Sequence, residues 1–196
     1  MVKKGTWFFD PDGYTRYPLY HGTNSYLLPS IQQHGLGGRD IITEWRALDL
    51  YREIAVLTKH DINDPTLRQD GSYRHGEVYL GAYEGRARGY TGELFGLIEY
   101  GLNFLPRSIR EELLRRYPEI AVLFHADRWS IVLRLPRLHL ADLCGWTSDD
   151  PCDRSSIGYR NEYLMTLASY RGTGIGFYAP TPTFRLRRMT RDFEVV

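Results

Sequence analysis

The sequence has only two cysteines and no long apolar run. Cys144 and Cys152 form no Cys-x-x-Cys pair and have no histidine at zinc-ligand spacing, so we expect two free thiols, no disulfide framework and no metal cofactor. No apolar stretch reaches the roughly 18 residues of a membrane helix, and the amino terminus shows no signal-peptide core. These absences predict a cytoplasmic protein without a membrane partner.

Lysine is also scarce, because Lys3, Lys4 and Lys59 are the only ones among 25 basic residues and the rest are arginines. Arginine binds phosphate in a bidentate manner and stacks on aromatic rings, which suits a protein that binds a dinucleotide or a nucleic acid. The same bias is typical of a GC-rich genome, and the arginines are spread along the chain. The bias alone therefore leaves both interpretations open.

The overall composition indicates a globular protein. With 196 residues, 42% of them hydrophobic and 25% charged, the chain suits one domain over residues 1–196 that buries roughly 70% of its unfolded surface. Expected helices cover residues 25–34, 44–59, 84–100 and 106–117, and expected strands cover 17–21, 77–81, 120–124, 129–135, 159–166, 174–178 and 184–188. Helices precede most of the strands, so the predicted class is α+β.

The first segment with chemical potential is His21-Gly22-Thr23, where an expected strand gives way to a turn. Gly22 lacks a Cβ, so its backbone N–H and C=O can approach a planar carboxamide closely. The His21 imidazole can hydrogen-bond a ribose hydroxyl without acting as an acid or a base. On its own, a His-Gly pair is more often a hydrogen-bonded turn than a binding site.

Two tyrosines form the second feature. Tyr79 falls on an expected strand and Tyr90 on the helix that follows, a separation that lets two rings close on one flat ligand. Offset stacking contributes about 0.5–1.5 kcal/mol per ring beyond area burial. In a chain with 15 tyrosines such a pair also arises by chance.

The third feature is Glu162, within Asn161-Glu162-Tyr163 on an expected strand. A carboxylate beside the nicotinamide ribose would stabilise the positive charge that develops on the sugar when the glycosidic bond of NAD breaks. Loss of one such preorganised contact typically costs about 3 kcal/mol. Without the other two features, Glu162 is a solvent-facing strand residue.

Taken in order, these segments resemble the His-Tyr-Glu set of ADP-ribosyltransferases, as found in the catalytic domain of poly(ADP-ribose) polymerases and in diphtheria-toxin-like enzymes. The resemblance implies two packed, mainly antiparallel sheets with flanking helices and a split cleft for NAD as co-substrate. It assigns NAD binding to His21, Gly22, Thr23, Tyr79 and Tyr90, and catalysis to Glu162 with His21 and Tyr79.

Two departures narrow the expected activity. Polymerases place a serine on the carboxamide eight residues after the first tyrosine, where this chain has Ala87. Arginine-modifying relatives carry a second glutamate two residues before the catalytic one, where this chain has Arg160. The chain also shows no regulatory helical domain, so we expect mono-transfer to an acceptor other than arginine, as in a bacterial toxin or phage-defence effector.

The acceptor is the least defined part of the prediction. Arg160 and the carboxyl-terminal Arg185, Arg187, Arg188 and Arg191 could form a basic surface, which favours RNA or DNA over protein. A toxin role would add an antitoxin or immunity protein as partner. The alternatives are an NAD glycohydrolase or phosphorylase that depletes NAD, a non-catalytic domain that binds ADP-ribose or RNA, and a tRNA 2′-phosphotransferase, which does not rely on an Asn-Glu-Tyr glutamate.

Overall fold

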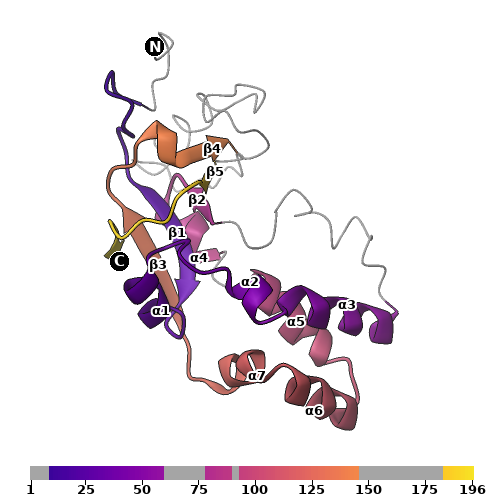
Figure 1. The fold of residues 1–196 in the computed structure, drawn as a ribbon. Helices are drawn as coiled ribbons and strands as arrows, with labels where there is room; N and C mark the ends of the chain where they lie inside the picture. The colour runs from indigo at the N-terminus through magenta and orange to yellow at the C-terminus, as the bar shows by residue number, and fades with distance from the viewer. Residues whose placement is uncertain (1–8, 60–77, 90–92, 146–182) are drawn as a thin grey trace, which may run out of the picture.

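A computed structural model describes residues 9–59, 78–89, 93–145 and 183–196, which form an α+β structure as the sequence predicts (Figure 1). Its strands build one six-stranded antiparallel sheet in the order β4-β5-β2-β1-β3-β6. The strands are β1 (Leu19–Asn24), β2 (Tyr79–Gly81), β3 (Ser130–Leu135), β4 (Leu143–Gly145), β5 (Thr183–Leu186) and β6 (Glu194–Val195). The helices are α1 (Leu28–His34), α2 (Ile41–Glu44), α3 (Ala47–Thr58), α4 (Glu84–Gly89), α5 (Glu93–Leu102), α6 (Arg107–Arg116) and α7 (Pro118–His125), with a short 3-10 helix at Leu140–Asp142.

The centre of the sheet is the long pairing of β1 with β3, from Leu19↔Leu135 to Asn24↔Ser130. Because side chains alternate along a strand, every second residue of β1 and β3 faces the same side. That side carries the first apolar core, and partly buried residues of α1 pack against it. The buried members of this core are Phe9, Leu19, Leu36, Leu80, Ala82, Ile131, Leu133, Leu135, Leu138, Leu143 and Phe184.

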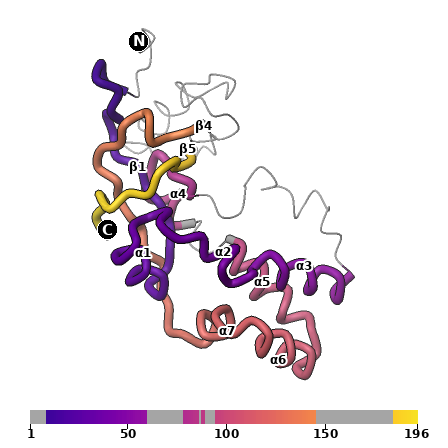
Figure 2. The backbone as a smooth tube through the Cα atoms, viewed as in Figure 1, coloured from indigo at the N-terminus to yellow at the C-terminus, as the bar shows by residue number. Residues whose placement is uncertain are grey.

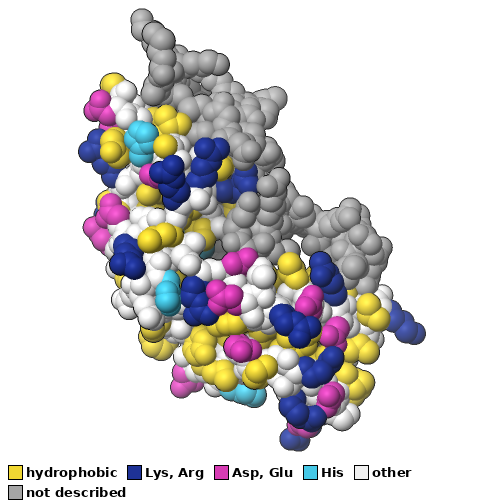
Figure 3. Space-filling model, viewed as in Figure 1, with side chains coloured by type: hydrophobic (Ala, Val, Ile, Leu, Met, Phe, Trp, Pro, Cys, Tyr) yellow, Lys and Arg dark blue, Asp and Glu magenta, His cyan; other side chains and the backbone are white. Residues whose placement is uncertain are grey.

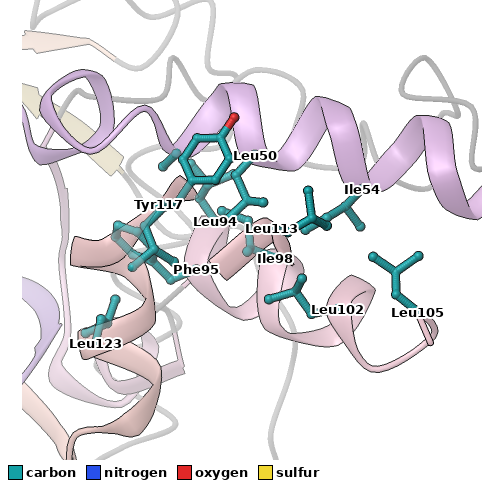
Figure 4. Close-up of a cluster of buried hydrophobic side chains, with 12 residues drawn as sticks. Leu50, Ile54, Leu94, Phe95, Ile98, Leu102, Leu105, Leu113, Tyr117 and Leu123 are labelled. Atoms are coloured by element: carbon teal, nitrogen blue, oxygen red, sulfur yellow. The ribbon is translucent and has the colours of Figure 1, made fainter. Parts of the chain in front are cut away.

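A second apolar core lies among the helices, away from the sheet (Figure 4). Helices α3 and α5 pack along each other, and α6 and α7 close the cluster. Its buried residues are Ala47, Leu50, Ile54, Leu94, Phe95, Ile98, Leu102, Leu105, Leu113, Tyr117, Ile120 and Leu123. Burial of this apolar surface is what stabilises helices that would each be marginal alone.

The helical group lies beyond the end of β1, and the tube view shows the chain passing between sheet and helices (Figure 2). An aromatic row links the two parts. The ring of Tyr26, just after β1, lies edge-on to Trp45 with centroids 6.4 Å apart, and Trp45 lies 5.8 Å from Phe95 of α5. The strand that carries His21 is thereby joined directly to the helical core.

Several expected elements are confirmed, with shifted ends. The strand at residues 129–135 is β3, and the helices at 44–59 and 106–117 are α3 and α6. The helix expected over 84–100 appears as α4 and α5, and residues 90–92 between them lie outside the described part. The expected strands at 159–166 and 174–178 also lie outside it.

One expected strand is wrong, because residues 120–124 belong to helix α7. Pro118 stands in the first turn of that helix, Glu119 follows it, and Ile120 and Leu123 are buried on one face at helical spacing. A short apolar run cannot distinguish a strand from a buried helix, and here the packing against the second core decides. Of the two sheets that the resemblance implies, the described residues show one.

The start of α1 also differs from the expectation. The helix begins at Leu28 and not at residue 25. The Ser25 Oγ accepts a hydrogen bond from the backbone N–H of Trp129 at 3.1 Å, which links the end of β1 to the start of β3. The Asn24 Oδ1 atom accepts from the N–H of Leu27. The expected end of the helix is confirmed, since α1 ends at His34 and Gly35 follows with a φ of 85°. Within the described residues, no helix is long and apolar enough to span a membrane.

Candidate functional site

The first two predicted segments meet between β1 and β2. Nδ1 of His21 lies 2.9 Å from the backbone carbonyl oxygen of Tyr79, a residue 58 positions further along the chain. A carbonyl can only accept, so Nδ1 carries the proton and donates it. This bond ties the histidine segment to the tyrosine segment.

The protonation state of His21 follows from this environment. Burial lowers the pKa of His21, and the hydrogen bond to the Tyr79 carbonyl opposes that shift without cancelling it. The imidazole is therefore neutral at pH 7, with Nδ1 protonated and Nε2 a free lone pair. Nε2 can accept a hydrogen bond from a hydroxyl, which is the role the sequence predicts for this ring.

The backbone of Gly22 is turned toward β2, as hydrogen bonds elsewhere in the sheet establish. The N–H of Val196 donates to the carbonyl of Val132, so the N–H and C=O of Val132 face β6. The N–H and C=O of the next residue, Leu133, therefore face β1, which makes His21↔Leu133 a hydrogen-bonded pair. Neighbouring residues in a strand direct these groups to opposite sides. The N–H and C=O of Gly22 therefore face away from β3, toward β2.

The pairing of β2 with β1 stops before it reaches Gly22. Only Tyr20↔Gly81 is paired between these strands, and continuing that register by two residues would set Gly22 opposite Tyr79. There the Tyr79 carbonyl is bound to His21 instead. Gly22 thus presents one donor and one acceptor, side by side, at the point where the two strands separate.

The side chain of Tyr79 lies on the same face of the sheet as Gly22. Tyr20 and Gly81 are paired, and Gly22 and Tyr79 each stand two residues away from one of them, so all four share a face. The first apolar core, which includes Leu80, lies on the opposite face of the sheet. A flat group bound to the Gly22 backbone would therefore lie next to the Tyr79 ring.

Thr23 and Ala87 are both buried, one on β1 and the other on the helix that packs against it. Thr23 is buried and is paired with Ile131, on the same face as His21, so its side chain is turned away from the Tyr79 ring. Ala87 is buried in α4, which packs across β1, β2 and β3. The helix that carries Ala87 thus lies against the strands that supply His21 and Tyr79.

The remaining predicted residues lie outside the described part of the chain. These are Tyr90 and the catalytic candidate Glu162, together with Arg160. The structure consequently brings together His21, Gly22 and Tyr79, and leaves the roles of Tyr90 and Glu162 as predictions.

The carboxyl-terminal arginines do not all behave as the sequence predicts. Arg187, Arg188 and Arg191 are exposed, but Arg185 is only 5% exposed and cannot contribute to a basic surface. It is the one charged side chain that is fully buried among the residues described. Strand alternation between Phe184 and Leu186, both in or against the apolar core, places Arg185 on the Tyr79 face.

No local sequence pattern predicts that the Arg185 side chain is buried; its burial follows from its place in the sheet, between β2 and β4. Arg185 is paired with Tyr79 on one side and with Cys144 on the other. The Cys144 thiol is free, and its Sγ accepts a hydrogen bond from Nε of Arg187 at 2.9 Å. In the described part of the chain, no three side chains of metal-ligand type cluster.

Comparisons with known proteins found no match: no family model, no curated protein and no solved structure resembles this chain significantly.

Proposed function

We propose that this protein is a mono-ADP-ribosyltransferase. It would cleave the bond between the nicotinamide nitrogen and C1′ of the ribose in NAD. The electron pair of that bond passes to nicotinamide and neutralises its ring, and a nucleophilic atom of the acceptor bonds to C1′ and loses its proton. The products are nicotinamide, the ADP-ribosylated acceptor and one proton.

The observation that carries this proposal is the backbone of Gly22. A primary carboxamide has one acceptor oxygen and a donor NH₂ group on the same carbon, and Gly22 offers the complementary N–H and C=O where β1 and β2 separate. A pair of hydrogen bonds fixes the plane and direction of the carboxamide, which a single bond cannot do. Nicotinamide bound this way lies on the face that carries the Tyr79 ring.

The other roles follow from the chemistry of each group. The His21 side chain starts from the opposite face of β1 to the Tyr79 ring, so its Nε2 is proposed to accept from a ribose hydroxyl at the point where β1 and β2 separate. Tyr79 is proposed to stack on the nicotinamide ring, with Tyr90 on its other side. Glu162 is proposed to stabilise the oxocarbenium-like transition state. Ala87 offers no hydroxyl, so the carboxamide depends more strongly on Gly22 than it would with a serine there.

We propose nucleic acid as the acceptor. Arg187, Arg188 and Arg191 are exposed beyond the end of β5, which is the strand next to Tyr79. On the helices α3 to α7, basic and acidic side chains alternate (Figure 3), as in the ion pairs Arg107–Glu111 and Arg46–Asp49. A phosphate backbone would meet three exposed guanidinium groups close together in sequence near the carboxyl terminus.

The test uses NAD labelled on the adenylate phosphate, incubated with purified protein and, separately, with RNA, DNA and cell proteins. We expect label on nucleic acid, and its loss in Glu162→Gln. Glu194→Gln removes a carboxylate of the exposed strand β6 and serves as the control that keeps full activity.

The outcomes separate the competing functions. Label on protein alone would contradict the acceptor. Rapid loss of NAD without labelled macromolecules would replace the transferase with a hydrolase or phosphorylase. Unchanged NAD with every acceptor, at high protein concentration, would contradict the proposed function.

A further inference from the structure

Asn24, the last residue of β1, has a polar side chain that is 7% exposed. Its Oδ1 accepts a hydrogen bond from the N–H of Leu27 at 3.1 Å. Because an N–H can only donate, this contact fixes the orientation of the amide, with the oxygen at Leu27 and Nδ2 on the other side. Among the residues that the structure describes, none accepts a hydrogen bond from Nδ2 of Asn24.

The turn after β1 does not account for this NH₂ group. The large majority of buried polar side-chain atoms in proteins have a hydrogen-bond partner, and a buried donor without one costs about 1–3 kcal/mol. The turn uses the oxygen of Asn24 alone, and a serine would supply an acceptor oxygen to Leu27 equally well. The nitrogen of the amide is therefore informative about what this end of β1 binds.

Asn24 and Gly22 share a face and an edge of β1. Side chains alternate along a strand, so the Asn24 side chain lies on the face of Gly22 and Tyr79, about 7 Å from Gly22 along the strand. The backbone N–H of Asn24 is directed to the β2 side, as that of Gly22 is. Asn24 thus continues the row of hydrogen-bonding groups that Gly22 begins.

This edge of β1 is paired on one side of Gly22 and unpaired on the other. Toward the start of β1, Tyr20 is paired with Gly81, so β2 occupies the edge. Toward the end of β1, no described residue is paired with this edge. A ligand whose carboxamide is bound at Gly22 would therefore continue along the edge toward Asn24.

The part of NAD that follows the nicotinamide ring is its ribose, which carries two hydroxyl groups. A hydroxyl has lone pairs that can accept from Nδ2 of Asn24, and it keeps its own O–H to donate. One ribose hydroxyl could therefore join Asn24 to the carboxylate proposed for Glu162. Hydrogen bonds in such a chain polarise one another. The phosphates also accept hydrogen bonds, but they lie beyond the ribose.

We propose that Nδ2 of Asn24 donates a hydrogen bond to a hydroxyl of the nicotinamide ribose and fixes the sugar for cleavage. This inference rests on the proposed function, since it assigns a further residue to the same NAD site. It also predicts that the ribose and the carboxamide are recognised by different residues of one strand, Asn24 and Gly22.

The test is calorimetry with nicotinamide, nicotinamide riboside, and the 2′-deoxy and 3′-deoxy forms of the riboside. Asn24→Ser keeps an oxygen for the Leu27 N–H and removes Nδ2. We expect Asn24→Ser to weaken riboside binding about fivefold, as for one neutral hydrogen bond, and nicotinamide binding less than twofold. Asn103→Ser, at an exposed position just after α5, is the matched control and should leave both affinities unchanged.

The deoxy forms identify the bond itself. The wild-type protein should bind one of the two deoxy forms about fivefold more weakly than the riboside. Asn24→Ser should bind that form and the riboside equally, because removal of the hydroxyl and removal of the amide lose the same hydrogen bond. If Asn24→Ser does not fold, the wild-type comparison still decides. Equal affinity of the wild type for the riboside and both deoxy forms would overturn the inference.

The remaining outcomes separate a wrong role for Asn24 from a wrong function. If Asn24→Ser weakens nicotinamide and the riboside equally, Asn24 only orders the backbone of Gly22. If it weakens nicotinamide mononucleotide but not the riboside, the donor binds phosphate. Either result overturns the ribose assignment and leaves the proposed function standing. If the wild-type protein binds none of these compounds, the proposed function is overturned and the role of Asn24 falls with it.

Discussion

The carbonyl oxygen of Tyr79 accepts a hydrogen bond from Nδ1 of His21 at 2.9 Å, where the backbone of Gly22 would otherwise find its partner in the sheet. The His21 side chain thus replaces a backbone hydrogen bond between β1 and β2. As a consequence, the N–H and C=O of Gly22 face β2 at a point where the two strands are no longer paired. Everything proposed for nicotinamide depends on this substitution of a side chain for a backbone bond.

Gly22→Ala should reduce nicotinamide affinity by about tenfold, equivalent to roughly 1.4 kcal/mol. The added methyl group lies on the Tyr79 face, where the bound ring would have to stack. Gly81→Ala is the matched control, because its Cβ would come no closer than 3.9 Å to the nearest atoms, the carbonyl oxygens of Tyr20 and Tyr83. Calorimetry with nicotinamide measures both. Equal loss in the two variants would contradict the role of Gly22.

His21 should make the protein less stable in acid. Burial holds the pKa of His21 below that of a histidine in the unfolded chain, so below about pH 6.5 the unfolded state binds a proton that the folded state does not. The free energy of unfolding therefore falls as the pH drops through this range, until the folded histidine is also protonated. His21→Asn keeps a donor near the position of Nδ1 and removes the titration.

Urea unfolding at pH 7.5 and pH 5.5 tests this expectation. The loss of stability between the two values should be smaller in His21→Asn than in the wild type. His34→Asn, at the half-buried last residue of α1, is the comparison variant and should leave in place the pH response that belongs to His21. An identical pH response in His21→Asn and the wild type would show that His21 is not held neutral by the fold.

Tyr117 and Glu53 join α6 to α3. The Tyr117 hydroxyl donates to Oε1 of Glu53 at 2.6 Å, and Arg116 forms an ion pair with the same carboxylate. Burial, followed by the hydrogen bond to Glu53, raises the pKa of Tyr117 to about 12. The neutral phenol therefore contributes stability that is complete below about pH 10 and lost as the pH rises toward 12.

Tyr117→Phe should lower the free energy of unfolding at pH 7 by about 1 kcal/mol, the usual net value of one hydrogen bond. It should also remove the part of the alkaline destabilisation that belongs to this group. Tyr100→Phe is the control, since Tyr100 is 62% exposed on α5. Chemical denaturation at pH 7 and pH 10.5 measures both effects. Equal stability of the wild type and Tyr117→Phe at pH 7 would mean that the bond contributes nothing.

Two glycines of α5 should respond in opposite directions. A Cβ on Gly101 would lie 2.5 Å from Cγ2 of Ile54, so Gly101→Ala forces α3 and α5 apart and should cost about 1–3 kcal/mol. A Cβ on Gly96 meets nothing within 4 Å, and Gly96→Ala should stabilise the protein by about 0.5–1 kcal/mol through helix propensity. Thermal unfolding of both variants checks the sign. A stabilising Gly101→Ala would contradict the close packing of the two helices.

The sequence was sufficient where a local pattern has one solution. The apolar spacing of residues 44–59 predicted α3, and the β-branched and aliphatic run at 129–135 predicted β3. His21, Gly22 and Tyr79 could also be chosen from the sequence, because motif order and spacing are one-dimensional properties. Residues 120–124 show the limit, since five apolar residues fit a strand or a buried helix equally well and only packing against the second core decides.

The tertiary structure alone decided the orientation and the burial of these residues. Which side of β1 the Gly22 N–H and C=O face depends on the pairing of β1 with β3, and whether they are bonded depends on where β2 stops pairing. The burial of Arg185 beside Tyr79 likewise depends on β5 lying next to β2, more than 100 residues apart in the chain. Residue identity is written in the sequence, but strand register and burial arise from long-range contacts that no local pattern encodes.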